Sequence, residues 1–151
     1  MRETLFNWLG QDLTGLCCLD AFAGSGALGL EAASRGAARV LLLERDAKAL
    51  AALRGNIREL GVAGTETLAT DAMAYLAVPG ERFDVIFLDP PFAEGLLEQV
   101  LPHAATHLRP EGKIYAESPK PLASEWLDRL GLTLIRQGRA GLSHHCLLEL
   151  A

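Results

Sequence analysis

The chain has 151 residues, half of them apolar, which is enough for one domain with a substantial core. Its formal net charge of -5 argues against a protein that coats nucleic acid nonspecifically, because such proteins carry a basic patch or stripe. No run of about 18 apolar residues and no basic-then-hydrophobic leader is present, so we expect neither a membrane partner nor export. Cys17, Cys18 and Cys146 lack metal-ligand spacing, which fits buried thiols and no metal site. We therefore expect a single cytoplasmic domain over residues 1–151.

Apolar runs of strand length alternate with segments of helical period along the whole chain. The expected strands lie at residues 16–22, 40–44, 65–70, 83–89, 113–117, 133–137 and 145–150. Several of them are almost entirely apolar, as is typical of parallel strands that helices cover on both faces. The alternation predicts an α/β fold with a doubly wound, mostly parallel, seven-stranded sheet.

The segments between these strands predict helices. The clearest covers residues 46–60, with Asp46 suited to the N-cap and Gly61 just past the end. Pro102 interrupts the helical stretch at 96–108, so we expect a break or kink rather than one straight helix. A short helix is expected near 124–130. Only a glycine-containing turn separates the last two strands, which predicts a C-terminal antiparallel hairpin, unlike a plain dinucleotide-binding domain.

A glycine-rich loop follows the first expected strand. Gly24 to Gly29 reads G-S-G-A-L-G, which matches G-x-G-x-x-G at a strand-to-helix junction, although a tight turn with close helix packing also explains it. Glu44 ends the second strand, where its carboxylate can accept both ribose hydroxyls of a cofactor or simply be a solvated strand-end acid. Together these features predict an adenosine-type cofactor without saying which one.

Asp20 indicates which cofactor the loop would bind. A carboxylate just before the glycines would repel a pyrophosphate, whereas it favours the sulfonium and amino groups of S-adenosyl-L-methionine. Asp71, after the third strand, is placed to bind the adenine amine or to cap a helix. The predicted cofactor-binding residues are Asp20, Phe22, Gly24, Ser25, Gly26, Glu44, Arg45, Asp71 and Ala72.

The fourth expected strand ends in Asp89-Pro90-Pro91-Phe92, at the edge where open α/β sheets bind ligands. Methylation of an exocyclic amine requires the nitrogen lone pair to leave conjugation with the ring. The Asp89 carboxylate and the Pro90 carbonyl can each accept one N–H, and the rigid proline pair fixes their directions. Phe92 can stack on a base that has left its helix or loop. Unless the motif is only a strand-ending turn, Asp89, Pro90, Pro91 and Phe92 are predicted to be the catalytic residues.

Three segments resemble the RsmD family of bacterial 16S ribosomal RNA guanine-N2 methyltransferases. They are R-E-T-L-F-N-W-L at 2–9, L-D-A-F-A-G-S-G-A-L-G-L-E-A at 19–32 and F-D-V-I-F-L-D-P-P-F at 83–92. The resemblance implies a Rossmann-like class I methyltransferase fold with S-adenosylmethionine at Asp20, Gly24, Gly26, Glu44 and Asp71. It also implies transfer to a guanine N2 amine of ribosomal RNA within the small subunit or its precursor, with residues 89–92 binding the amine. Family members usually carry a further N-terminal segment with a basic stretch, which is expected to help close the cofactor site and hold RNA; this sequence begins without it.

Three other functions remain open at this point. The same motifs fit an adenine-N6 methyltransferase on DNA or RNA, an NAD-binding oxidoreductase domain, or a non-catalytic RNA-binding factor. His103 and His107 lie one helical turn apart without a third ligand, so we expect surface or packing roles rather than a metal site. Alternation in the hairpin sends one of His144 and His145 inward, which leaves a role beside the substrate open.

Overall fold

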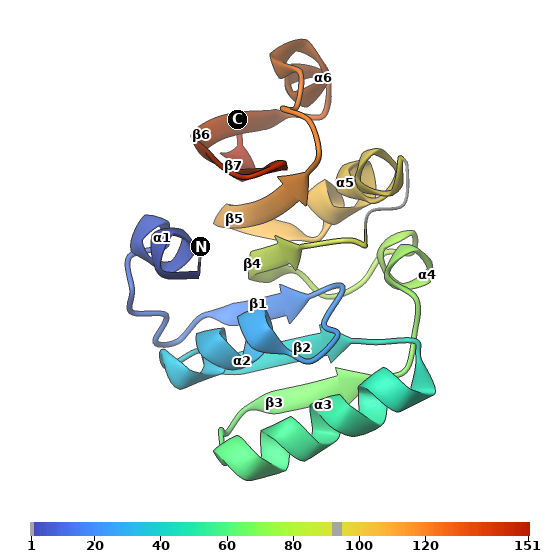
Figure 1. Ribbon diagram of the computed structural model, residues 1–151. Coiled ribbons are helices and arrows are strands. Elements are labelled where there is room, and N and C mark those ends of the chain that lie inside the picture. The colour runs from blue at the N-terminus through green and yellow to red at the C-terminus, as the bar shows by residue number, and fades with distance from the viewer. Residues whose placement is uncertain (1, 92–94) are drawn as a thin grey trace.

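The computed structural model describes residues 2–91 and 95–151, and within them seven strands form one sheet in the order β3-β2-β1-β4-β5-β7-β6 (Figure 1). Strands β1 to β5 are parallel, and β7 runs antiparallel between β5 and β6. The predicted mostly parallel sheet with an antiparallel hairpin is therefore confirmed. The strands are β1 (Cys17–Asp20), β2 (Arg39–Leu43), β3 (Thr65–Leu68), β4 (Phe83–Leu88), β5 (Leu108–Ser118), β6 (Leu132–Ala140) and β7 (Ser143–Leu150).

Helices cover both faces of the sheet (Figure 1). The helices are α1 (Arg2–Trp8), α2 (Ala27–Ser34), α3 (Ala47–Leu60), α4 (Ala72–Leu76), α5 (Leu96–Thr106) and α6 (Ser124–Arg129). Side chains of α1, α2 and α3 share one hydrophobic core, and those of α4, α5 and α6 share the other. Strand β4 contributes to both, Val85 and Phe87 to the first core and Ile86 and Leu88 to the second. The apolar run at residues 85–88 is explained by this burial on both faces.

Helix α3 has the ends that its sequence predicts. The Asp46 carboxylate accepts a hydrogen bond from the Ala49 backbone N–H at 2.8 Å. At the other end Gly61 is left-handed, with φ 64°, and its N–H donates to the Ile57 carbonyl. Caps of this kind each stabilise a helix by about 1 kcal/mol.

We predicted a break or a kink at Pro102, and the break is wrong, because α5 runs through this proline as one helix. Proline cannot donate the backbone hydrogen bond expected inside a helix, which makes this position costly in isolation. Leu97, Val100, Leu101 and Ala104 are buried on both sides of Pro102 and anchor the two halves in the core. Tertiary packing therefore overrides the local preference.

Strand β5 begins earlier than its sequence pattern suggests. Leu108, which we expected to end the preceding helix, pairs with Phe83 of β4, and the register shifts before Val85 pairs with Lys113. The polar segment at residues 109–112 interrupts the apolar run, so the sequence pattern does not show that the strand begins at Leu108. Further along, Leu88 pairs with Ala116, and Glu117 of β5 pairs with His145 of β7. The ends of β4 and β5 and the start of β7 consequently lie at one edge of the sheet.

Candidate functional site

A cleft of about 630 Å³ lies at the edge where the parallel strands end. The cleft brings together six of the predicted cofactor-binding residues and three residues of the segment Asp89-Pro90-Pro91-Phe92, which we call the proline motif. Asp20, Ser25 and Gly26 do not line it, and Phe92 lies outside the described residues. The lining residues are Ala21, Phe22, Gly24, Leu43, Glu44, Arg45, Thr70, Asp71, Ala72, Asp89, Pro90, Pro91 and Leu96.

Four lining residues were not predicted. Ala21, Leu43 and Thr70 each stand beside a predicted residue at a strand end, and that position is the only sequence signal for them. Leu96 begins α5 and reaches the cleft through the tertiary fold. Nothing in its sequence surroundings marks it.

Glu44 joins two loops that form the cleft. One carboxylate oxygen accepts the Gly24 backbone N–H at 3.0 Å, and the other accepts the Asp46 N–H at 2.8 Å. A carboxylate has about four lone-pair positions, so each oxygen can still accept a further hydrogen bond. A Cβ at Gly24 would meet no other atom of the described residues within 4 Å, so these residues leave open space beside this backbone. Glu44 can therefore hold the loop and bind ribose hydroxyls.

The rest of the glycine loop serves close packing. Gly26 has φ 92°, and a Cβ there would lie 2.5 Å from a Leu53 methyl carbon of α3. At Gly29 a Cβ would lie 2.7 Å from a Leu42 methyl carbon of β2. The Ser25 carbonyl accepts a hydrogen bond from the Asn56 side chain at 2.9 Å. Gly26 thus packs closely against α3, Ser25 is exposed and joined to α3 through its carbonyl, and Gly24 faces the cleft. Cofactor binding by Ser25 and Gly26 stays a prediction.

Asp20 lies behind the cleft wall rather than on it, and its role beside the cofactor stays a prediction. The residue is 2% exposed; one carboxylate oxygen accepts the Gly29 N–H at 3.0 Å, and the other has no hydrogen-bond partner among residues 2–91 and 95–151. Burial, with smaller contributions from nearby Asp89 and Glu44, raises the pKa of Asp20 to about 7. Its carboxyl group ties β1 to the start of α2.

Asp71 is the N-cap of α4, as the alternative interpretation of this residue proposed. One carboxylate oxygen accepts the Ala74 N–H at 3.2 Å, and the other lies 3.6 Å from an Arg45 guanidinium nitrogen. Asp71 also lines the cleft, so capping through one oxygen leaves the other available to a ligand.

The proline motif begins where β4 ends. Asp89 is exposed at the strand end, but the protein around its carboxyl group and the neighbouring Glu117 carboxylate raise its pKa to about 6. The group is thus mostly ionised at neutral pH and can accept hydrogen bonds there. Pro90 and Pro91 continue the cleft wall beside it.

A polar cluster that the sequence did not predict adjoins Asp89. The Ser143 hydroxyl donates to Glu117 at 3.1 Å, and His145 Nδ1 lies 3.6 Å from the same Glu117 oxygen. The Tyr115 hydroxyl lies 3.3 Å from His145 Nδ1. We call Asp89, Tyr115, Glu117, Ser143 and His145 the edge cluster.

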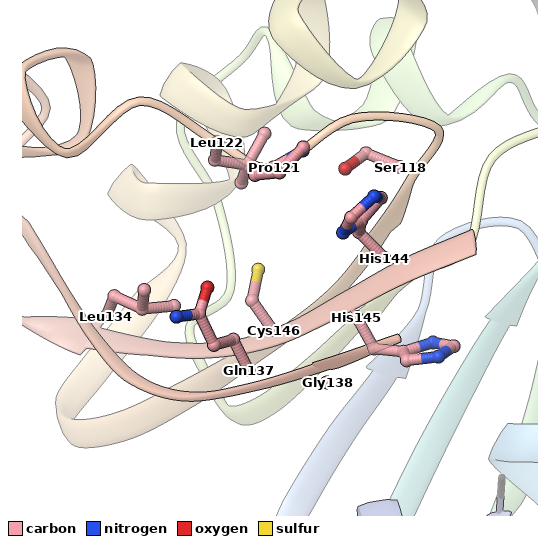
Figure 2. A pocket seen from close by; sticks show the side chains of 9 residues that line it. All are labelled: Ser118, Pro121, Leu122, Leu134, Gln137, Gly138, His144, His145 and Cys146. Atoms are coloured by element: carbon pink, nitrogen blue, oxygen red, sulfur yellow. The ribbon is translucent and has the colours of Figure 1, made fainter. Parts of the chain in front are cut away.

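The two hairpin histidines point to opposite faces, as alternation predicted. Figure 2 shows the His144 ring beside Ser118 at a small pocket, with the His145 ring turned away from it. This pocket holds about 20 Å³, room for one water molecule, and is too small for a base. His145 is 2% exposed within the edge cluster.

His107 has a packing role. Its ring nitrogens contact the backbone carbonyls of Leu76, Val78 and Glu81 at 2.8 to 3.1 Å, beneath the loop between α4 and β4. In the described ranges, no cluster of three His, Cys, Asp or Glu residues could hold a metal ion. No helix in this part of the chain combines the length and hydropathy needed to cross a bilayer.

Comparison with known proteins identifies the family. The family profile described as Conserved hypothetical protein 95 matches residues 1–149. Ribosomal RNA small subunit methyltransferase D of Escherichia coli K12 is 43% identical over 120 residues, which cover 78% of this chain and 61% of that protein. The chain thus spans less than two thirds of this relative's length.

Two solved structures support the same assignment. The Escherichia coli protein yhhF is 37% identical with a TM-score of 0.87, over 99% of this chain and 84% of that one. The T. thermophilus 16S rRNA N2 methyltransferase RsmC, solved in complex with AdoMet and guanosine, is 26% identical with a TM-score of 0.77, over 99% of this chain and 41% of that one. The chain has the class I methyltransferase fold and belongs to the RsmD family.

Proposed function

We propose that the protein transfers a methyl group from S-adenosylmethionine to the exocyclic N2 amine of a guanine in small-subunit ribosomal RNA. The observation that carries the proposal is that Glu44 and Asp89-Pro90-Pro91 line one cleft. The name of the Escherichia coli relative supports ribosomal RNA of the small subunit as substrate. The name of RsmC and its ligands support the N2 position and the cofactor.

The charge of the cleft favours a cationic cofactor. Its ionisable lining residues are Glu44, Asp71 and Asp89 with a single arginine, Arg45, whose side chain is 77% exposed and faces Asp71. Such a wall repels a pyrophosphate and attracts a sulfonium and an ammonium group. The cleft volume of about 630 Å³ also suits a nucleoside-sized ligand. These features support S-adenosylmethionine over NAD, and when bound it supplies an electrophilic methyl group.

The residues of the chain then have separable roles. Glu44 binds the ribose hydroxyls while it holds the Gly24 backbone in place. The Asp89 carboxylate and the Pro90 carbonyl accept the two N–H groups of the amine, which turns the nitrogen lone pair out of conjugation. Stacking of the base on Phe92 remains part of the proposal.

The negative net charge of the chain is compatible with binding to a ribosomal particle. Arg136 and Arg139 are exposed on β6, the strand whose end reaches the cleft edge of the sheet, and could contact RNA phosphates. The small subunit or its precursor also presents ribosomal proteins, so binding need not depend on a strongly basic surface.

The test is methyl transfer from labelled cofactor to small ribosomal subunits that lack their natural modifications, followed by digestion to nucleosides. We expect N2-methylguanosine. N6-methyladenosine would favour the adenine alternative and contradict the proposed substrate. Binding of NAD without binding of S-adenosylhomocysteine, measured by calorimetry, would overturn the choice of cofactor.

A variant pair tests the amine-binding role. Asp89→Ala should lower turnover by about 100-fold or more while S-adenosylhomocysteine binds within a few-fold of wild type. Asp128→Ala is the control, because Asp128 is exposed on α6, away from the cleft. Unchanged turnover in the Asp89 variant would contradict the mechanism.

A further inference from the structure

The edge cluster forms a row across three neighbouring strands. Asp89 follows Leu88, which pairs with Ala116 of β5, so Asp89 and Glu117 are the next residues along these two strands. Glu117 in turn pairs with His145 of β7. The three side chains therefore follow one another along the edge of the sheet, outward from the cleft.

Glu117 is held firmly within this row. Ser143 donates to its Oε1 atom at 3.1 Å, and His145 Nδ1 lies 3.6 Å from the same atom. The His145 ring stacks on Tyr115 at 6.4 Å between centroids, with 11° between the planes. His145 Nε2 is buried and has no hydrogen-bond partner in the part of the chain that the structure describes, where packing and the Nδ1 contacts fix the ring. Only 23% of the Glu117 side chain is exposed.

We propose that Glu117, fixed by Ser143 and His145, is a positioning residue for Asp89, and that its neighbouring negative charge makes the Asp89 carboxylate a better acceptor for the proton that the methylated amine releases. This inference rests on the proposed function of the cleft. It adds a second carboxyl group, from a different strand, to the amine-binding motif.

The chemistry requires a proton acceptor after transfer. The amine nitrogen forms a bond to the methyl carbon, the carbon–sulfur bond breaks with its electron pair left on sulfur, and one N–H proton passes to the Asp89 carboxylate. An isolated aspartate holds a proton weakly, with a pKa of about 3.9. Desolvation and the Glu117 carboxylate raise the pKa of Asp89 to about 6, which makes it a better acceptor.

Other groups near Asp89 act in the same direction or stay neutral. Asp20 on β1 is coupled electrostatically to Asp89 and adds negative charge when ionised. Burial and the Glu117 carboxylate raise the pKa of Tyr115, so its hydroxyl keeps its proton. His145 faces Glu117 rather than Asp89. Glu117 is thus the partner whose charge can be removed with least disturbance.

The direct test is a carbon-13 NMR titration of the Asp89 carboxyl group in the ligand-free protein. We expect a midpoint near pH 6 in wild type. In Glu117→Gln the midpoint should fall by roughly one pH unit, because a neighbouring negative charge is lost. Glu149→Gln is the matched control, since Glu149 is on β7 but pairs with Lys113 at the opposite end of the strand. An unmoved Asp89 midpoint in Glu117→Gln would overturn the proposal.

Kinetics supply the second readout. In Glu117→Gln the acid limb of the kcat/KM profile should move to lower pH with the Asp89 midpoint, and kcat should fall by up to about tenfold. Ser143→Ala should lower kcat while S-adenosylhomocysteine affinity stays unchanged. An equal loss in Glu117→Gln at every pH would indicate a merely structural role and overturn the proposal. Absence of any methyl transfer would contradict the proposed function instead, and the titration would still decide whether the two carboxyl groups are paired.

Discussion

The Glu44 carboxylate accepts the Gly24 backbone N–H at 3.0 Å, and this bond joins residues 20 positions apart in the sequence. A second bond, to the Asp46 N–H, makes the same side chain the connection between the glycine loop and the start of α3. Binding of a ribose would thus depend on a carboxylate that the protein has already oriented.

Glu44→Ala should therefore weaken S-adenosylhomocysteine binding by about 10- to 100-fold, the range for hydrogen bonds to a charged group. Calorimetry measures this directly. Glu59→Ala, on the exposed face of α3, provides the control and should bind as wild type does. Equal affinity of the Glu44 and Glu59 variants would exclude Glu44 from the cofactor site.

Gly26 and Gly10 allow backbone strain and steric overlap to be separated. Both have φ 92°, but a Cβ at Gly26 would lie 2.5 Å from Leu53, whereas one at Gly10 would meet nothing within 4 Å. Gly10→Ala should reduce the free energy of unfolding by about 1 kcal/mol. Gly26→Ala should cost about 1–3 kcal/mol more because of overpacking. Urea denaturation compares them, and equal losses would contradict the packing role of Gly26.

Because the pKa of Asp20 is raised, we expect the free energy of unfolding to depend on pH. The folded protein keeps the Asp20 proton up to about pH 7, whereas the unfolded chain releases it near pH 4. The folded state therefore binds more protons across this interval, so the free energy of unfolding falls as pH rises through it. Relative to Asp20→Asn, wild type should lose on the order of 3 kcal/mol between pH 4 and pH 8. A difference between the two proteins that stays constant with pH would show that Asp20 titrates normally.

The helix-capping role of Asp71 and its proposed cofactor-binding role can be tested separately. Asparagine caps helices about as well as aspartate, so Asp71→Asn should keep the stability of wild type, while Asp71→Ala should lose about 1 kcal/mol. In Asp71→Asn the oxygen that caps the helix is kept. The oxygen that lies near Arg45 is replaced by an amide nitrogen, which donates hydrogen bonds instead of accepting them. We expect cofactor affinity to fall about tenfold in both variants. Wild-type affinity of Asp71→Asn would leave helix capping as the sole role of this residue.

Local sequence patterns predicted the parallel strands and the start of the site well. Strand β4 is an apolar run that ends directly before Asp89, and both features are visible within a few residues. The start of β5 escaped prediction because Arg109, Pro110 and Glu111 interrupt the apolar pattern. The break expected at Pro102 did not form because buried neighbours hold α5 together.

The edge cluster could not have been predicted from periodicity. Alternation predicts that one of the two hairpin histidines points inward, and the structure shows that it is His145. The pattern does not say which strand lies beside it. The contact between His145 and Glu117 depends on the insertion of β7 next to β5, a long-range pairing. For the same reason, the position of Asp89 beside Glu117 can be predicted only when the strand order is known. The motif Asp89-Pro90-Pro91-Phe92 itself is visible in the sequence.

The insertion of β7 between β5 and β6 also constrains the order of folding. Strand β6 precedes β7 in the chain and is therefore synthesised first. Because β7 is the strand that joins β6 to the sheet, β6 cannot join the sheet before residues 143–150 have been synthesised. The two strands can first associate as a local hairpin, which then docks on β5 as a unit. Ser143 and His145 reach Glu117 only in that docking step. A nascent chain can thus bring Asp89 and Glu117 together through the pairing of β4 with β5 before Ser143 and His145 fix Glu117.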